Sequence, residues 1–306
     1  MSRRAFLNAL GASVAGLAVT PFSCALQSSP GTARRPVLFG IVADCHYADA
    51  EARGSRFYRH SAEKLAECVG LMNERKPDFL IELGDFKDQD NPPVEERTVD
   101  YLQTIEGVFS RFDGPRYHVL GNHDMDSISK TQFLDNIENT GIRPDRSYYS
   151  FDCGGLHFVV LDANYRADGA DYDHGNFGWT DANIPPAELD WLKRDLARAP
   201  GPTIVFIHQL LDGAGPVYVK NAESVRRILE QSGKVPAVFQ GHHHKGSYGL
   251  INGIHYYTLR AVVEGPGSEN NSYAIVEVLP DGGITITGYQ KATGMDLAPV
   301  TAVVAG

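Results

Sequence analysis

Short apolar runs alternate along the chain with longer segments in which apolar residues recur every three or four positions. Continuous apolar runs are typical of strands buried on both faces, and the longer spacing is typical of amphipathic helices. The predicted strands are Val37–Ala43, Phe79–Leu83, Tyr117–Leu120, Tyr148–Asp152, Leu156–Leu161, Thr203–Ile207, Val235–Phe239, His255–Leu259, Tyr273–Val278 and Ile284–Tyr289. The predicted helices are Phe57–Glu74, Glu95–Phe112, Thr131–Asn139, Pro186–Ala199 and Ala222–Gln231.

The order of these elements predicts one α/β domain over residues 36–306. Strands and helices alternate in the first half, and hairpin spacing appears later, as at Cys153-Gly154-Gly155. This order favours two packed sheets in a single domain. Residues 165–183 form a long predicted loop, rich in Asp, Gly and aromatic residues, that is long enough to overhang a site.

The amino terminus predicts an export signal and linker over residues 1–35. Ser2-Arg3-Arg4-Ala5-Phe6-Leu7 resembles a twin-arginine signature, and an apolar stretch and a small-residue site, Ser23-Cys24-Ala25, follow it. We therefore expect a periplasmic or extracellular protein without a stable membrane span. A frayed helix with a chance arginine pair, or lipidation at Cys24, is the alternative.

Composition limits the partners. The 306 residues carry a formal charge of −10, which disfavours binding to nucleic acid, since that needs a basic face. An acidic protein still binds a phosphate when metal ions supply the positive charge. The charge is therefore compatible with a small phosphorylated substrate.

Metal-binding residue types cluster directly after five of the predicted strands. The blocks are Asp44-Cys45-His46, Gly84-Asp85, Gly121-Asn122-His123-Asp124, His208 and Gly241-His242-His243-His244. Each block alone is weak, because a histidine after a strand is usually structural and a histidine run is often a solvated loop. Together they indicate a ligand site, since the carboxyl ends of strands form the binding edge of an open α/β sheet.

These five blocks resemble the five motifs of the calcineurin-like metallophosphoesterases, without a substituted ligand position. The resemblance implies a two-sheet β-sandwich flanked by helices, in a four-layer arrangement. A narrower resemblance, to the manganese-dependent ADP-ribose/CDP-alcohol diphosphatases, rests on residues 39–49 and 57–61, on Gly175-Asn176-Phe177-Gly178 and on Gly241-His242-x-His244-x-Gly246-x-Tyr248. It implies hydrolysis of phosphoesters or phosphoanhydrides, on nucleotide diphosphate derivatives or phosphodiesters.

The resemblance also implies roles for the site residues. Two divalent metal ions (Mn, Fe, Zn or Co) would be held by two sets that share a bridging Asp85: Asp44, His46 and His244, and Asn122, His208 and His242. The attacking group would be a hydroxide bridging the metals. Cys45 is expected to point away from the metals, because side chains alternate along an extended segment.

His123 and Asp124 are the expected catalytic pair. His123 would protonate the leaving oxygen or bond the transition state, and Asp124 would hold the His123 ring in the right tautomer. An ordinary loop role is the alternative for Asp124. Asp88 is expected to support a ligand rather than bind metal itself.

For several residues near the motifs, two interpretations remain open: contact with the substrate, or packing within the protein. Arg56, Tyr58 and their neighbours Tyr47, Arg59 and His60 either contact substrate or form a helix start with a solvated basic edge. Tyr172, Phe177 and Trp179 either stack on a base or pack within their loop. An exported phosphomonoesterase is the alternative function, and a non-catalytic scaffold on the same fold is a more distant one.

Overall fold

A computed structural model describes residues 35–300. The predicted export signal, apart from its last residue, lies outside the described residues. Within residues 35–300, no helix has the length and apolar character needed to cross a membrane.

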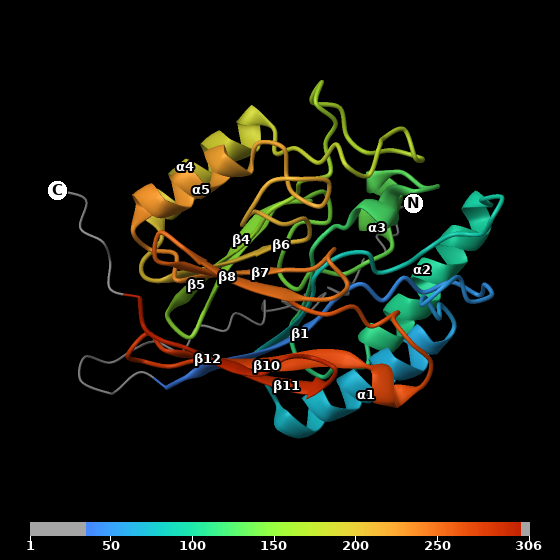
Figure 1. Cartoon of the computed structure of the whole chain (residues 1–306), viewed down its shortest axis with the longest axis horizontal. Coiled ribbons are helices and arrows are strands. Elements are labelled where there is room, and N and C mark those ends of the chain that lie inside the picture. Colours follow the sequence, from blue (N-terminus) through green and yellow to red (C-terminus); the bar gives the residue numbers. More distant parts are fainter. Residues whose placement is uncertain (1–34, 301–306) are drawn as a thin grey trace, which may run out of the picture.

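Two six-stranded mixed sheets form the centre of the domain (Figure 1). The first has the order β12-β11-β10-β1-β2-β3 and the second β4-β5-β6-β7-β9-β8. The strands of the first sheet are β1 (Val37–Val42), β2 (Phe79–Glu82), β3 (Arg116–His118), β10 (Ser272–Val278), β11 (Ile284–Gln290) and β12 (Met295–Leu297). Those of the second are β4 (Tyr149–Cys153), β5 (Leu156–Val160), β6 (Thr203–Ile207), β7 (Ala237–Gln240), β8 (Ser247–Ile251) and β9 (Ile254–Thr258).

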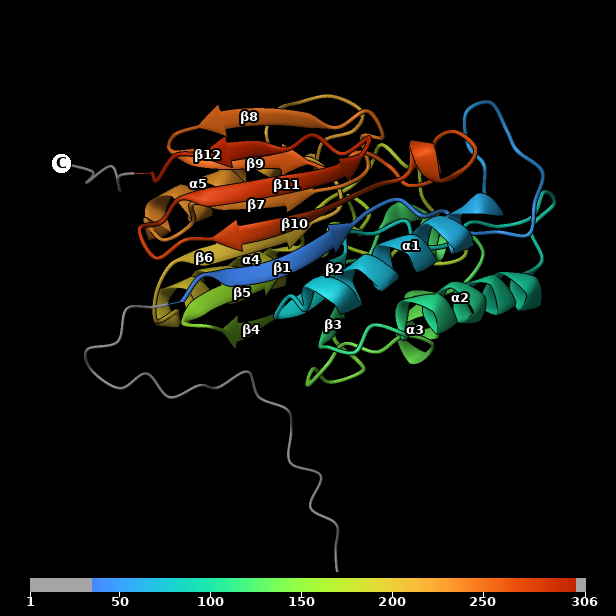
Figure 2. The same ribbon diagram turned by 90° about the horizontal axis from the view of Figure 1, so that it is seen from below.

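Helices cover the outer face of each sheet (Figures 1 and 2). The helices are α1 (His60–Arg75), α2 (Glu95–Phe109), α3 (Lys130–Asp135), α4 (Pro186–Arg198) and α5 (Ala222–Ser232), with short 3-10 turns η1 (Asn122–Met125) and η2 (Ser268–Asn270). α1, α2 and α3 pack on the first sheet, and α4 and α5 on the second. The predicted fold, a β-sandwich flanked by helices, is confirmed.

A layer of aromatic rings fills the space between the sheets. Phe39 of β1 stacks on Phe79 of β2, with ring centroids 5.1 Å apart, and meets Phe158, Phe206 and Phe239 of the second sheet edge-on. These rings are buried, so the hydrophobic effect holds the two sheets face to face. The core thereby fixes where the ends of both sheets lie.

The predicted elements differ from the structure mainly at the edges. β8 and β12 are not predicted, because β8 alternates between half-buried and exposed positions and β12 has three residues. The predicted helix 57–74 begins only at His60, because the segment before it pairs with another part of the chain: Arg56 forms a β-bridge with Glu264, and the N–H of Phe57 donates to the Val263 carbonyl. Cys45, Cys68 and Cys153 are buried, and Cys68 is a free thiol, so it forms no disulfide bond with Cys153.

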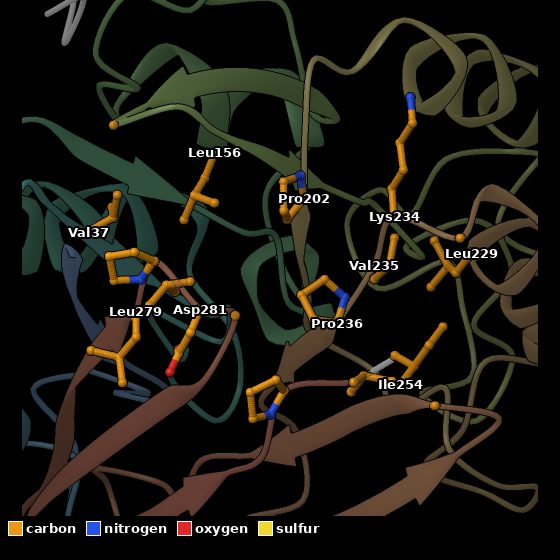
Figure 3. A pocket seen from close by; sticks show the side chains of 18 of the residues that line it. Val37, Leu156, Pro202, Leu229, Lys234, Val235, Pro236, Ile254, Leu279 and Asp281 are labelled. Atoms are coloured by element: carbon orange, nitrogen blue, oxygen red, sulfur yellow. The ribbon is translucent and has the colours of Figure 1, made fainter. Parts of the chain in front are cut away.

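The two ends of the sandwich differ in character. β1 and β2 run parallel, as do β5, β6, β7 and β9, so their carboxyl ends gather at one end of the domain. At the amino ends lies a cavity of about 400 Å³, between apolar side chains such as Leu156, Pro236 and Ile254 (Figure 3). The residues predicted to bind metal all lie at the carboxyl end.

Candidate metal centre

The five sequence blocks meet at the carboxyl ends of the strands. Their backbones are tied to one another, since the N–H of Asp44 donates to Gly84 O (3.0 Å), and that of His46 to Asp85 O (2.8 Å). The N–H of His242 donates to a carboxylate oxygen of Asp44, at 3.0 Å. Each loop is therefore positioned by another loop.

Four of the predicted ligands have left-handed backbone conformations. The φ angles are 54° at Asp44, 46° at His46, 56° at Asp85 and 65° at His242. Residues other than glycine adopt this region at a cost and concentrate in it at functional sites. The sharp bends turn the side chains of these residues toward one another.

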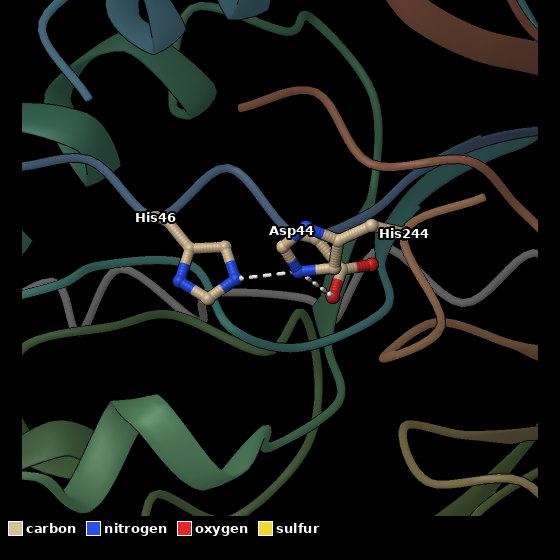
Figure 4. A group of neighbouring side chains, drawn as sticks. All are labelled: Asp44, His46 and His244. Atoms are coloured by element: carbon tan, nitrogen blue, oxygen red, sulfur yellow. Dashed lines mark hydrogen bonds and ion pairs between the residues drawn. The ribbon is translucent and has the colours of Figure 1, made fainter. Parts of the chain in front are cut away.

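Asp44, His46 and His244 form one donor group (Figure 4). The Nε2 atoms of His46 and His244 are 3.2 Å apart, and His244 Nε2 is 3.7 Å from Asp44 Oδ1. Asp44 and His46 are fully buried, and His244 is partly buried. The three donor atoms thus converge on one point.

Asp85, His208 and His242 form a second donor group. His242 Nδ1 lies 3.2 Å from His208 Nε2, which lies 3.1 Å from Asp85 Oδ2. The same Asp85 oxygen is 3.5 Å from His46 Nε2 in the first group. Asp85 therefore lies between the two groups, as expected for a bridging ligand.

The outer nitrogens of three imidazoles are held by acceptors. His46 Nδ1 is 3.1 Å from Asp88 Oδ2, and His244 Nδ1 is 2.6 Å from Glu264 Oε1. His208 Nδ1 is 2.8 Å from the Leu83 carbonyl. Such partners place the ring proton on Nδ1 and leave the Nε2 lone pair for a metal.

The donor atoms fit divalent cations. Burial lowers the pKa of His46 to about 3, so its ring is neutral and its Nε2 lone pair faces that of His244. Facing lone pairs are satisfied by a cation between them. Asn122 Oδ1 and His242 Nε2 are also buried without a hydrogen-bond partner among the described residues. Carboxylate, amide and imidazole donors together suit Mn, Fe, Zn or Co.

His123 lies beside the first group. Its ring centroid is 4.6 Å from that of His46, and its side chain is 25% exposed, so it is accessible from solvent. Burial alone would lower the pKa of His123, but the carboxylates of Asp126 and Asp85 outweigh burial and raise the pKa to about 9. These two carboxylates therefore favour the protonated form of the ring.

The predicted role of Asp124 is wrong, and Asp126 takes that place. Asp126 Oδ2 is 2.6 Å from His123 Nδ1, whereas the buried Asp124 carboxylate accepts backbone N–H groups, including those of Phe86 (2.9 Å) and Gly121 (2.8 Å). Asp124 points away from the His123 ring into the bend that carries Asp85. It stabilises that bend, and it does not set the tautomer of His123.

Two supporting carboxylates were missed in the sequence. Asp126 was within reach of a local argument, because it lies three residues after His123, directly after the end of η1. Glu264 had no local signal, since only the folded chain brings it to His244, and that hydrogen bond lowers the pKa of Glu264 to about 2. Asp88 contacts His46, in agreement with its expected supporting role.

The residues that could contact substrate differ in how far their side chains are exposed to solvent. Tyr58 is buried, while the Arg56 side chain is 32% exposed and lies 3.8 Å from Asp88 Oδ2. Tyr172 is fully buried and stacks on Phe177 with centroids 3.8 Å apart. Trp179 is 50% exposed, and its ring lies 6.0 Å from that of His242.

Comparisons with known proteins agree with this geometry. Residues 37–246 match the calcineurin-like phosphoesterase family. A manganese-dependent ADP-ribose/CDP-alcohol diphosphatase from Oryza sativa is 28% identical over 82% of this chain and 91% of its own length. The protein of that name from Arabidopsis thaliana is 25% identical over 86% and 98%. The crystal structure of a dimetal phosphatase from Danio rerio has the same fold, with a TM-score of 0.73 and 22% identity over 87% of this chain and 99% of that one.

Proposed function

The chain belongs to the calcineurin-like phosphoesterase family and is a metal-dependent hydrolase of phosphoesters; we propose that its substrates are nucleotide diphosphate derivatives. The observation that carries the proposal is the pair of donor groups that share Asp85, with the His123 ring beside them. The choice of diphosphates rests on the relatives named as ADP-ribose/CDP-alcohol diphosphatases, which match most of the chain.

We assign the metal ligands as two sets around Asp85. Asp44, His46 and His244 would hold one ion, and Asn122, His208 and His242 the other. Bound ions of this kind activate water as a nucleophile and neutralise charge on the phosphoryl oxygens. Two carboxylates orient the ligand rings: Asp88 holds the ring of His46, and Glu264 holds the ring of His244.

His123 would serve as the general acid. Its accessible ring is positioned by Asp126, which would accept the Nδ1 hydrogen and leave an Nε2 hydrogen for the leaving oxygen. A diphosphate bond needs this help less than an alkyl ester does, because a phosphate is the better leaving group. His123 would therefore matter more for esters than for diphosphates.

A substrate panel tests the proposal. Protein stripped of metal and reloaded with Mn²⁺ is assayed on ADP-ribose, CDP-choline, bis-p-nitrophenyl phosphate and AMP, with products identified by ³¹P NMR. We expect cleavage of the two diphosphates to nucleoside monophosphates, and loss of turnover in Asp85→Ala.

The matched control is Gly107→Ala, an exposed helical position without neighbours within 4 Å of the added methyl group. Turnover of AMP alone would replace the diphosphatase proposal with a phosphomonoesterase. Wild-type turnover in Asp85→Ala would overturn the metal centre itself.

Export remains a proposal from the sequence alone. We propose that the protein acts outside the cytoplasm, on the strength of the Arg3-Arg4 pair and the apolar stretch after it. Replacement of both arginines by lysine should retain the protein in the cytoplasm of a bacterial host, as measured by fractionation. An unchanged distribution would contradict export through this signal.

A further inference from the structure

Trp179 presents an open aromatic face next to the metal centre. It is 50% exposed, and within residues 35–300 the other exposed large hydrophobic residues are Val94, Tyr248 and Leu250. The Trp179 ring lies 6.0 Å from the ring of His242, at an angle of 51°. It is therefore an exposed indole directly adjoining a group of metal-binding side chains.

The loop that carries Trp179 is held on both sides by hydrogen bonds. Before it, the N–H of Gly175 donates to Met125 O at 2.9 Å. After it, the N–H of Asp181 donates to Gly178 O (2.8 Å), and Asn183 Nδ2 donates to Asp181 O (2.7 Å). The backbone that carries Trp179 is thus ordered before any ligand arrives, so that binding costs little loop entropy.

The other aromatic side chains of the loop are occupied with packing. Tyr172 and Phe177 stack on each other with an interplanar angle of 4°, and Tyr172 is fully buried. Phe177 is partly buried and packs against the core beside α1, α2 and α3, so both rings anchor the loop, whereas Trp179 is exposed. Of these three aromatic residues, Trp179 is the one available to a ligand.

We propose that Trp179 is the stacking platform for the nucleobase of the substrate, and that it determines the preference for nucleotide-containing diphosphates. The proposal rests on the proposed diphosphatase function. Every purine or pyrimidine has a flat π-face, so stacking does not depend on which base is present. An indole is a large aromatic partner for such a face. The ribose of a nucleotide separates its base from its phosphate, so a base on Trp179 leaves the phosphate over the neighbouring metal ligands.

This role is tested with two diphosphate substrates, one that contains a base and one that does not. ADP-ribose is compared with P¹,P²-dimethyl diphosphate, which has the diphosphate bond and lacks a base. In Trp179→Ala, the ratio of kcat/KM for ADP-ribose to that for the dimethyl compound should fall about 5- to 150-fold, the range set by loss of one base-stacking contact. In Trp179→Phe, which restores an aromatic face, most of the ratio should return.

Trp191 supplies the matched control. It lies on α4 with its ring 5.0 Å from that of Tyr148, and it is one of the two tryptophans in the chain. Trp191→Phe should leave the ratio unchanged and make Trp179 the only fluorescent tryptophan. In that variant AMP should quench the fluorescence, and ribose 5-phosphate should not.

The outcomes separate the two proposals. If Trp179→Ala lowers kcat/KM equally for both substrates, or for neither, the stacking role is overturned. Trp179 would then only shield His242 from solvent. If the wild-type protein cleaves neither diphosphate, the diphosphatase proposal fails. The fluorescence titration then still decides whether Trp179 binds a base, because it needs no turnover.

Discussion

Gly121 gives a test of how closely the loops of the metal centre are packed. A methyl group built on Gly121 would lie 2.1 Å from the backbone nitrogen of Asp85 and 2.3 Å from its Oδ1. Carbon atoms in ordinary contact stay about 3.5–4.0 Å apart, so Gly121→Ala must displace the bridging carboxylate by roughly 1 Å. The backbone itself permits alanine, since φ is −97° and ψ is 168°.

The displacement would break the hydrogen bonds that hold Asp85. Its Oδ1 accepts from the His123 N–H at 2.7 Å, and its own N–H donates to Asp124 at 3.2 Å. Overpacking of this kind costs about 1–3 kcal/mol of stability. A shift of about 1 Å at reacting groups lowers the rate roughly 100-fold. We therefore expect Gly121→Ala to fold, with a lower Tm, weaker metal binding and a loss of kcat/KM of about that size.

The assay combines three measurements on one protein preparation. Differential scanning calorimetry gives the Tm, competition with a chelator gives the metal affinity, and ADP-ribose hydrolysis gives kcat/KM. Gly107→Ala on α2 is the control, because nothing lies within 4 Å of its added methyl group and alanine favours a helix by up to about 1 kcal/mol. Wild-type metal affinity and activity in Gly121→Ala would refute the argument that Asp85 bridges in this position.

Three further changes probe the supporting residues. Asp126→Asn should lower kcat for ester substrates about 10- to 100-fold with little change in KM, because it removes the carboxylate that orients His123. An unchanged kcat and an unchanged pH–rate profile would count against this role. Glu264→Gln should weaken metal binding through His244 by a similar factor, measured by chelator competition, and undiminished affinity would contradict it. Away from the centre, burial alone would lower the pKa of His157, but two aspartate partners raise it above 6.5. That contribution to stability is present below pH 6.5 and lost as pH rises through the folded pKa, so the Tm deficit of His157→Gln should be larger at pH 6 than at pH 9; an equal deficit would exclude the charged pairs as its source.

Much of the site followed from local patterns. Apolar runs predict strands, and the blocks that follow them carry Asp44, Asp85, Asn122 and their partners, so the metal-binding edge is visible in the order of residues. Such features depend on a few neighbouring residues, which is why the sequence shows them. The strands β8 and β12 were not predicted although each pairs with a strand adjacent in the chain, because β8 has only half-buried and exposed positions and β12 has three residues.

The pairing of side chains was decided only by the tertiary structure. Asp124 and Asp126 are both near His123 in sequence, but the turn of η1 directs Asp126 to the ring and Asp124 to buried backbone N–H groups. Glu264 reaches His244 only because both loops meet at the end of the sandwich.

Exposure was likewise decided by packing. Tyr172 and Trp179 have the same aromatic character in the sequence, yet one is buried under its loop and the other faces solvent beside His242. The sequence by itself determined which chemistry the chain carries, because that depends on residue type and local order. The tertiary structure decided which side chain performs each role, because direction and burial arise only when distant segments pack together.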